Sequence, residues 1–411
     1  MPDTLAMILA GGRGKRLYPL TRDRTKPAVP FGGIYRLIDF TLSNCMNSGL
    51  RQVYVLTQYK SDSLNRHLSL AWSILNRELG EFIDAVPAQQ RIGEAWYRGT
   101  ADAIWQNVRL IRASGAKHLF VLSGDHIYKM NYRLMIECHE GWGAKATIAA
   151  REKPIESAQA FGVAVTDEAS RLLAFEEKPE DPTPIPGRPD TALVSMGVYL
   201  FNVDFLCEWL ERDSQLRTEH DFGRDVIPAM MQTGDVYVYN FRNEATGEPR
   251  FWEDIGTRDA YWRASMELLE LHPRFNLFNP RWPLRCYHGQ YPPARTVFAD
   301  EDQIGNAGNV LDSMISEGCL VVGAQVKHSI LSPNVKVRCY ASVEDSVVMN
   351  SAQIGKGAKI RRAIIDKDAV IGNGAEIGYD EDRDRERFDV TREGVVVIPK
   401  GAIVEAQPGR V

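Results

Sequence analysis

The sequence predicts two domains of different class, an α/β doubly wound domain followed by a parallel β-helix. Short apolar runs alternate with helix-type segments up to about residue 270, and a six-residue aliphatic repeat appears after residue 330. The length of 411 residues also favours two domains, because one compact core rarely grows so large. We therefore expect an α/β domain at 1–270, a linker at 271–295 and a β-helix domain at 296–411.

The first domain alternates buried strands with amphipathic helices. Four apolar runs predict parallel strands, at residues 5–10, 52–57, 118–124 and 145–150. Two segments predict helices, at residues 61–72 and 100–114, the second with Thr100 as its N-cap. Strand, helix and strand at this spacing predict a doubly wound sheet that binds ligands at the carboxyl ends of its strands.

The second domain carries a regular aliphatic repeat. The segment "IGKGAKI" begins at Ile354 and "IGNGAEI" begins at Ile371, and each has another isoleucine six positions after the first. A three-sided parallel β-helix places one inward side chain on each side of a coil, which is this period. A plain antiparallel β-domain is the alternative. The proline-rich stretch at 274–295 suits neither helix nor strand and predicts the linker.

Composition argues against several classes of protein. The 44% hydrophobic and 25% charged residues are ordinary for a globular chain, and the net charge of -5 disfavours a general nucleic-acid binder. No apolar run reaches the roughly 18 residues of a membrane span, and the N-terminus does not resemble a secretory signal. The six cysteines are scattered without a CxxC pair, so we expect free thiols and a cytoplasmic protein.

The stretch "MILAGGRGKRLYPLTRDRTKP" runs from a strand into glycines and basic residues, which is typical of a phosphate site. A Walker A loop requires Ser or Thr where Arg16 stands, and a dinucleotide fingerprint requires glycine where Leu17 stands. The remaining pattern is L-A-G-G-x-G-x-R-L…K-P, which nucleotidyltransferases share. Backbone N–H groups beside the glycines can approach a triphosphate, while Arg16 and Lys26 can bind a departing pyrophosphate. A basic surface turn is the alternative.

This loop and six further motifs resemble the bacterial ADP-glucose pyrophosphorylases, or glucose-1-phosphate adenylyltransferases, over nearly the whole chain. The motifs are "PAQQR…WYRGTADA", "SGDHIYKM", "FEEKP", "SMGVYLF", "DFGRDVIP" and "WEDIGT". The resemblance implies a Rossmann-like nucleotidyltransferase domain, a left-handed β-helix, and ADP-glucose synthesis from ATP and glucose 1-phosphate for glycogen. The sugar phosphate is already a nucleophile, so in-line displacement at the α-phosphorus needs alignment and charge neutralisation rather than a protein base.

The resemblance also assigns site residues. Asp125 and Asp254 would hold Mg²⁺, which prefers one or two carboxylates together with phosphate oxygens and water. Arg16, Lys26 and Asp125 would be catalytic. Glucose 1-phosphate would contact Tyr97, Gly162, Glu177, Lys178 and Ser195. The nucleotide would contact Leu9, Ala10, Gly11, Gly12, Gly14, Gln90, Gly99, Thr100 and Asp125, with Gln89 as the alternative to Gln90 at the edge of adenine.

An effector site is the next expectation. Seven basic residues lie between Arg13 and Arg36 against one acid, Asp23, which is more positive charge than one triphosphate requires. The resemblance implies a homotetramer, a sugar phosphate or carboxylate activator, and AMP or phosphate as inhibitor. The candidate allosteric residues are Arg22, Arg24, Arg36, Gln58 and Trp96. Relatives often carry a basic residue where Asp23 stands, so we expect a shifted or weakened activator response.

Three alternative functions stay open. The chain could make a UDP-, dTDP- or GDP-sugar by the same chemistry. The β-helix could be an acyltransferase, for which His328 is the available histidine base in the C-terminal half beyond the linker. The chain could be a non-catalytic regulatory subunit, although such relatives lose the metal acids or loop cations that this sequence keeps.

Overall fold

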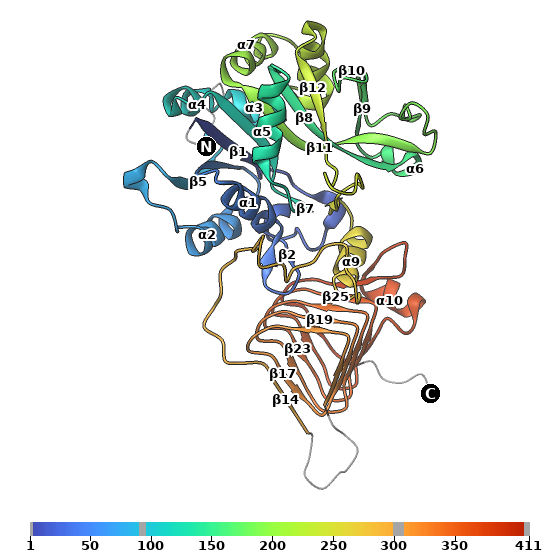
Figure 1. Cartoon of the computed structure of the whole chain (residues 1–411). Coiled ribbons are helices and arrows are strands. Elements are labelled where there is room, and N and C mark those ends of the chain that lie inside the picture. The colour runs from blue at the N-terminus through green and yellow to red at the C-terminus, as the bar shows by residue number, and fades with distance from the viewer. Residues whose placement is uncertain (1–2, 90–95, 299–307, 407–411) are drawn as a thin grey trace. The chain divides into compact units, whose positions relative to one another are not determined.

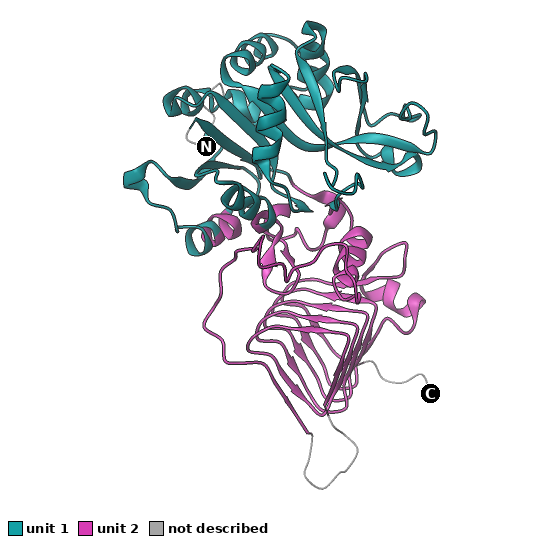
Figure 2. Ribbon diagram, viewed as in Figure 1, with its two compact units in different colours: residues 1–12, 40–61, 68–252 teal, residues 13–39, 62–67, 253–411 magenta. Residues whose placement is uncertain are grey.

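The computed structural model of the protein describes residues 3–89, 96–298 and 308–406 (Figure 1). The chain forms two compact units. Unit 1 comprises residues 1–12, 40–61 and 68–252, and unit 2 comprises residues 13–39, 62–67 and 253–411 (Figure 2). Unit 2 therefore combines most of the glycine-rich loop with the C-terminal part of the chain.

Unit 1 is built on a nine-stranded mixed sheet. At its centre β1 (Thr4–Leu9) is parallel to both β4 (Gln52–Thr57) and β6 (His118–Ser123). The long strand β11 (Thr191–Asn202) lies between β6 and β8 (Ala146–Pro154) and is antiparallel to both. The remaining strands are β5 (Phe82–Pro87), β9 (Gly162–Thr166), β10 (Leu172–Glu177) and β12 (Val236–Asn240). All four predicted strands form, and β11 makes the sheet mixed rather than wholly parallel.

Helices α3 (Thr100–Trp105) and α7 (Val203–Ser214) pack against the sheet. Leu5, Val121 and Ile148 of the strands share one buried cluster with Ile104 and Leu206 of these helices. The other helices are α1 (Leu37–Ser48), α2 (Asp62–Ala71), α4 (Val108–Ser114), α5 (Tyr132–Gly141), α6 (Ile155–Ala158) and α8 (Ile227–Met230), and β7 (His126–Tyr128) follows β6. The predicted helix at 61–72 corresponds to α2, and the predicted helix at 100–114 is divided into α3 and α4.

The predicted N-cap of α3 is wrong. Gly99 is the N-cap, and no side chain caps the helix. The N–H groups of Ala101 and Asp102 instead donate to the carbonyl of His220, at 2.9 and 3.3 Å. The two segments approach so closely that a Cβ atom on Gly99 would lie 2.3 Å from the carbonyl oxygens of Glu219 and His220. Glycine is therefore required at this position, and a distant part of the chain replaces the side-chain cap.

Three parallel sheets form the β-helix of unit 2. The first contains β14 (Arg295–Val297), β17 (Leu320–Val322), β20 (Lys336–Val337), β23 (Gln353–Ile354), β26 (Val370–Ile371) and β30 (Ile403–Val404). The second contains β15 (Asn309–Leu311), β18 (Gln325–Lys327), β21 (Ser342–Glu344), β24 (Lys359–Arg361) and β27 (Glu376–Ile377). The third contains β16 (Met314–Ile315), β19 (Ile330–Leu331), β22 (Val347–Val348), β25 (Ala363–Ile365) and β29 (Val396–Ile398), with β28 (Asp389–Val390) antiparallel at its edge.

Most strands of the β-helix pair with the third strand that follows them, so three strands make one coil. Ile354 pairs with Ile371 and Ile360 pairs with Ile377, as the repeat predicts. These side chains are at most 1% exposed and form the interior of the coils. The β-helix prediction is therefore confirmed. A short charged helix, α10 (Glu381–Arg387), is inserted between β27 and β28.

Helix α9 (Arg258–Glu267) follows β13 (Trp252–Asp254) and contacts the N-terminal segment of unit 2. The segment contains two 3-10 turns (Lys15–Leu17 and Lys26–Ala28) and the short strands β2 (Pro30–Phe31) and β3 (Tyr35–Arg36). From α9, Tyr261 Oη donates to the Pro30 carbonyl at 2.7 Å, and Trp262 Nε1 donates to the Asp345 carbonyl at 2.8 Å. One helix thus contacts both the N-terminal segment and the coils.

Two general expectations concern the chain as a whole. All six cysteines are free thiols, as predicted from their spacing. Within the described ranges, every helix is too short or too polar to cross a bilayer.

Candidate active site

A cavity of about 380 Å³ opens in unit 1 at the carboxyl ends of β1, β4 and β6. Parallel neighbouring strands end at the same sheet edge, so their following loops converge there. Eight of the predicted site residues line it: Leu9, Gly11, Gly12, Gln58, Tyr97, Gly99, Thr100 and Asp125. Residues that are far apart in sequence are thus brought together, as the motifs predict.

The start of the glycine-rich loop lies against the end of β4. A Cβ atom on Gly11 would stand 3.1 Å from Cβ of Gln58, whereas one on Gly12 would meet nothing within 4 Å. Gln58, a candidate allosteric residue, is therefore a neighbour of the loop inside this cavity. Ala10 is buried beside it and donates its N–H to the Leu56 carbonyl at 2.9 Å.

Asp221 also lines the cavity, and sequence reasoning assigned it no role. Thr100 Oγ1 donates to Asp221 Oδ2 at 2.9 Å and accepts from the N–H of Phe222 at 3.0 Å. The other carboxylate oxygen of Asp221 caps the turn at Phe222–Val226, accepting from Gly223 at 2.9 Å. The only signal in the sequence was an acid at the start of "DFGRDVIP", which is typical of an N-cap.

The residues predicted for the sugar phosphate gather around Glu177. β9 and β10 place Gly162 opposite Glu177, and a Cβ atom on Gly162 would lie 3.1 Å from Oε2 of that glutamate. A Cβ atom on Gly223 would lie 2.5 Å from the same oxygen. Lys178 pairs with Glu177 through its ammonium group, and its side chain is 54% exposed. Gly223 thus makes room for the Glu177 carboxylate, and Gly162 makes room for the Phe175 ring as well as that carboxylate, beside an accessible cation.

Hydrogen bonds fix three hydroxyl groups in unit 1, those of Ser195, Tyr199 and Tyr97. Ser195 Oγ accepts from the N–H of Gly197 at 3.3 Å and lies 3.5 Å from Tyr199 Oη. Burial raises the pKa of Tyr199, so its phenol stays neutral and keeps its proton for hydrogen bonding. Tyr97 Oη accepts from Asn107 Nδ2 at 2.9 Å, which fixes its ring beside the cavity.

Unit 2 brings together three other predicted residues. Lys26 Nζ lies 2.6 Å from Asp254 Oδ1, and only 9% of the lysine side chain is exposed. A Cβ atom on Gly256 would lie 3.0 Å from Asp254 Oδ2 and 3.2 Å from Arg16 Nη2, so Arg16 borders the same place. Gly14 has φ of +60°, and a Cβ atom there would stand 2.9 Å from Cβ of Lys26. The loop therefore needs glycine at 14 to seat this lysine.

The three arginines predicted for an effector lie in unit 2 with a lysine that sequence reasoning missed. Arg24 forms a buried ion pair with Asp366. Burial, reinforced by nearby Arg24, lowers the pKa of Arg36 to about 10. Burial, followed by the charges of Arg36 and Arg24, lowers the pKa of Lys367 to about 7. Arg36 and Lys367 are thus buried cations close to Arg24, and an added anion would stabilise their charged forms.

The negative charge of Asp23 is compensated by Arg22. Arg22 donates to Asp23 Oδ2 from Nε and Nη2, at 3.0 and 2.9 Å. The same guanidinium donates to the Lys400 carbonyl at 2.8 Å. The carboxylate therefore occupies Arg22, which lowers the positive charge that Arg22 can offer to another anion.

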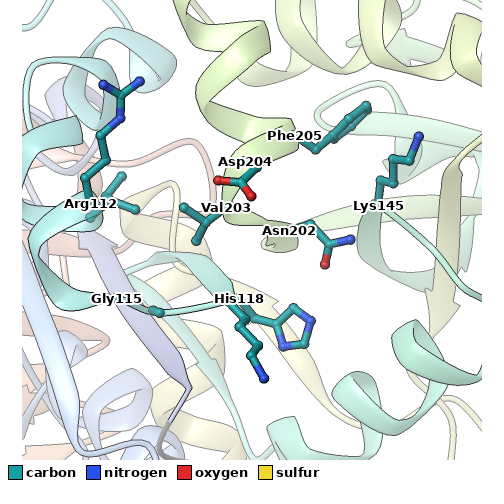
Figure 3. A pocket seen from close by; sticks show the side chains of 11 residues that line it. Arg112, Gly115, His118, Lys145, Asn202, Val203, Asp204 and Phe205 are labelled. Atoms are coloured by element: carbon teal, nitrogen blue, oxygen red, sulfur yellow. The ribbon is translucent and has the colours of Figure 1, made fainter.

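Some predicted residues are not placed at a site. Gln90 lies outside the described residues, and Gln89 is exposed. Trp96 is 52% exposed and does not line the cavity at the strand ends. A larger cavity of about 700 Å³, at the opposite edge of the sheet, is lined by His118, Lys145 and Asn202 among others and contains none of the predicted residues (Figure 3).

Comparison with known proteins gives two family matches. The family described as nucleotidyl transferase matches residues 5–270, and the family described as GlmU-like, C-terminal hexapeptide matches residues 292–398. A glucose-1-phosphate adenylyltransferase of Methylococcus capsulatus is 50% identical over 96% of this chain and 93% of its own. Glucose-1-phosphate adenylyltransferase 2 of Vibrio cholerae is 49% identical over 97% of this chain and 98% of its own. The chain is therefore a member of the nucleotidyl transferase family and belongs to its glucose-1-phosphate adenylyltransferases.

Proposed function

We propose that the protein joins ATP and glucose 1-phosphate into ADP-glucose and releases pyrophosphate, supplying ADP-glucose for glycogen synthesis. The convergence of eight predicted residues on one cavity at the carboxyl ends of β1, β4 and β6 carries the proposal. The names of the relatives support the choice of substrates. We expect a homotetramer, to be checked by light scattering, and a cytoplasmic location, where free thiols stay reduced.

Asp125 and Asp254 fit a Mg²⁺ site by their chemistry. Their side chains are partly accessible, at 26% and 18%, and offer the carboxylate oxygens that Mg²⁺ prefers. The ion would supply charge neutralisation at the phosphates. We propose that both carboxylates bind the same Mg²⁺ ion.

Groups of the protein itself would bind the two substrates and stabilise the leaving pyrophosphate. Leu9 to Gly12 would border the triphosphate with backbone N–H groups, and Arg16 and Lys26 would stabilise the negative charge of the leaving pyrophosphate. Lys178 would pair with the phosphate of glucose 1-phosphate, and Glu177 would accept hydrogen bonds from sugar hydroxyls. The sugar phosphate oxygen then attacks the α-phosphorus without a protein base.

Pyrophosphate release from the purified protein, measured with each nucleoside triphosphate and glucose 1-phosphate, tests this function. We expect ATP to be the preferred substrate. A higher rate with UTP or dTTP would assign a different product, and no release with any triphosphate would favour a regulatory subunit. Asp125→Asn should abolish most activity, whereas Asp204→Asn, at the opposite edge of the sheet, should not; full activity in Asp125→Asn would contradict the site assignment.

We further propose that Arg24, Arg36 and Lys367 bind an anionic effector. The depressed pKa values of Arg36 and Lys367 support the site, because an added anion would stabilise their charged forms. The pairing of Asp23 with Arg22 supports a shifted or weakened activator response. Activity titrated with fructose 1,6-bisphosphate, fructose 6-phosphate and pyruvate, and with AMP and phosphate as inhibitors, tests both points. A strong response to fructose 1,6-bisphosphate would contradict the role of Asp23.

A further inference from the structure

A buried aspartate–histidine pair lies in unit 1 directly behind the cavity. His220 is 3% exposed, and its Nδ1 is 2.7 Å from Asp213 Oδ2. Thr218 Oγ1 donates to the other oxygen of Asp213 at 2.8 Å, so both carboxylate oxygens are engaged. His220 also has φ of +51°, in the left-handed region that residues with side chains rarely adopt. The segment 213–220 is therefore tied together by these side-chain bonds, with His220 in an unusual backbone conformation.

This segment contacts the residues of the cavity through its main chain. The His220 carbonyl accepts from the first N–H groups of α3, and the segment passes so close to Gly99 that no side chain fits there. The next residue, Asp221, bonds the Thr100 hydroxyl at 2.9 Å. Gly99, Thr100 and Asp221 all line the cavity. Their positions are thus set from behind by the conformation of residue 220.

We propose that Asp213 and His220 are positioning residues for the nucleotide site, which act by fixing Thr100 and Asp221. Thr100 Oγ1 both donates to Asp221 and accepts from the N–H of Phe222, so the hydroxyl is fixed only while residues 220–222 keep their path. The Asp213–His220 bond holds that path. The inference rests on the proposed use of this cavity for ATP.

His220→Gly removes the imidazole without straining the backbone, because glycine adopts a φ of +51° easily. We expect the dissociation constant for ATP, measured by calorimetry well below the unfolding temperature, to rise about tenfold. His220→Asn should stay within about threefold of the wild type, because asparagine tolerates this φ and keeps an N–H donor for Asp213. Asp213→Asn, which keeps the shape but not the charge, should weaken ATP binding in the same direction.

His139→Asn is the matched control in unit 1. His139 is 1% exposed and bonds Thr147 and Asn202, but it does not line the cavity. We expect this variant to be destabilised while its ATP dissociation constant changes less than about twofold. A purely structural role for His220 predicts equal effects on ATP binding in His220→Gly and His139→Asn, and that result would overturn the proposal.

A double-mutant cycle with Thr100→Val decides whether His220 acts through Thr100. Thr100→Val alone should weaken ATP binding about tenfold, and adding His220→Gly should weaken it by less than about threefold more, because the two residues form one unit. Independent tenfold effects that multiply would contradict the positioning role. Unchanged ATP binding in Thr100→Val would instead contradict the proposed use of the cavity, which separates the two failures.

Discussion

The cations of the glycine-rich loop and its neighbours differ in what surrounds them. Lys26 is nearly buried and is paired with Asp254 at 2.6 Å, whereas Lys117, on another part of the chain, has a side chain that is 74% exposed. Water screens a buried cation less than an exposed one, so Lys26 can act more strongly on a nearby phosphate, and the Asp254 carboxylate offsets part of its charge. An exposed lysine contributes little for the opposite reason.

Lys26→Met should therefore lower kcat about 10²- to 10³-fold, because one charged contact to the leaving pyrophosphate is lost. Lys26→Arg should retain more activity, because the positive charge remains. Initial rates of pyrophosphate release give the values, and Lys117→Met is the matched control with an expected rate near the wild type. Equal losses of kcat in Lys26→Met and Lys117→Met would show that Lys26 has no special role.

We expect the affinity of the Lys367 site for anions to depend on pH. The pKa of Lys367 is lowered from 10.5 to about 7, first by burial and then by Arg36 and Arg24, so the ammonium form is lost as pH rises through about 7. Sulfate, which does not titrate in this range, should bind more tightly at about pH 6 than at about pH 8.5. Calorimetric titration at both pH values measures the difference. Lys367→Met should remove most of this pH dependence, and an unchanged dependence in that variant would contradict the assignment.

Elements of the β-helix are stabilised by side chains that repeat from coil to coil. Ile360 is fully buried and lies between Val343 and Ile377 in successive strands. Each coil depends on its neighbours for burial, so stability is shared along the stack. This stacking of coils could be predicted because "IGKGAKI" and "IGNGAEI" each carry two isoleucines at the same six-residue spacing.

Ile360→Ala should reduce the free energy of unfolding of unit 2 by about 2–5 kcal/mol, because it removes buried methyl groups and leaves a cavity between coils. Lys359→Ala is the adjacent control, and it should change stability little because that side chain is 55% exposed. Chemical denaturation followed by circular dichroism measures both variants. Similar midpoints for the two would contradict the proposed interior packing.

Other elements could not be predicted from local sequence. The capping of the first turn of α3 depends on the His220 carbonyl, more than a hundred residues away. The antiparallel direction of β11 depends on pairing with β6 and β8, which its apolar pattern does not encode. Asp221 and Lys367 were missed for the same reason, since their neighbours become close only in the folded chain. The glycine-rich loop could be singled out from the sequence because its glycines and cations lie within one short segment.

At the scale of the whole molecule, the two compact units do not coincide with two continuous stretches of sequence. Residues 13–39 belong to the same unit as the β-helix. Within that unit, Arg24 pairs with Asp366, and their side chains are 5% and 1% exposed. Residues 1–270 therefore lack part of the surroundings of their own glycine-rich loop.

A chain ending at residue 270 should consequently lose both activity and stable structure, because Arg24 would be left without its carboxylate. In the 411-residue chain, Asp366→Asn isolates this effect and should cost about 3–5 kcal/mol of stability, the usual penalty for an uncompensated buried charge. Circular dichroism, thermal melting and pyrophosphate release provide the readouts. A truncated protein with wild-type activity would show that the loop needs nothing from the C-terminal part.

The Arg24–Asp366 pair also joins two residues that are synthesised at different times. The two residues are 342 positions apart, so a ribosome adding about 5–20 residues per second takes roughly 20 to 70 seconds between them. During that interval the nascent chain carries the glycine-rich loop but not the carboxylate that neutralises its buried arginine. We therefore expect the growing polypeptide to stay inactive, and its buried arginine to stay unpaired with Asp366, until residue 366 has been synthesised.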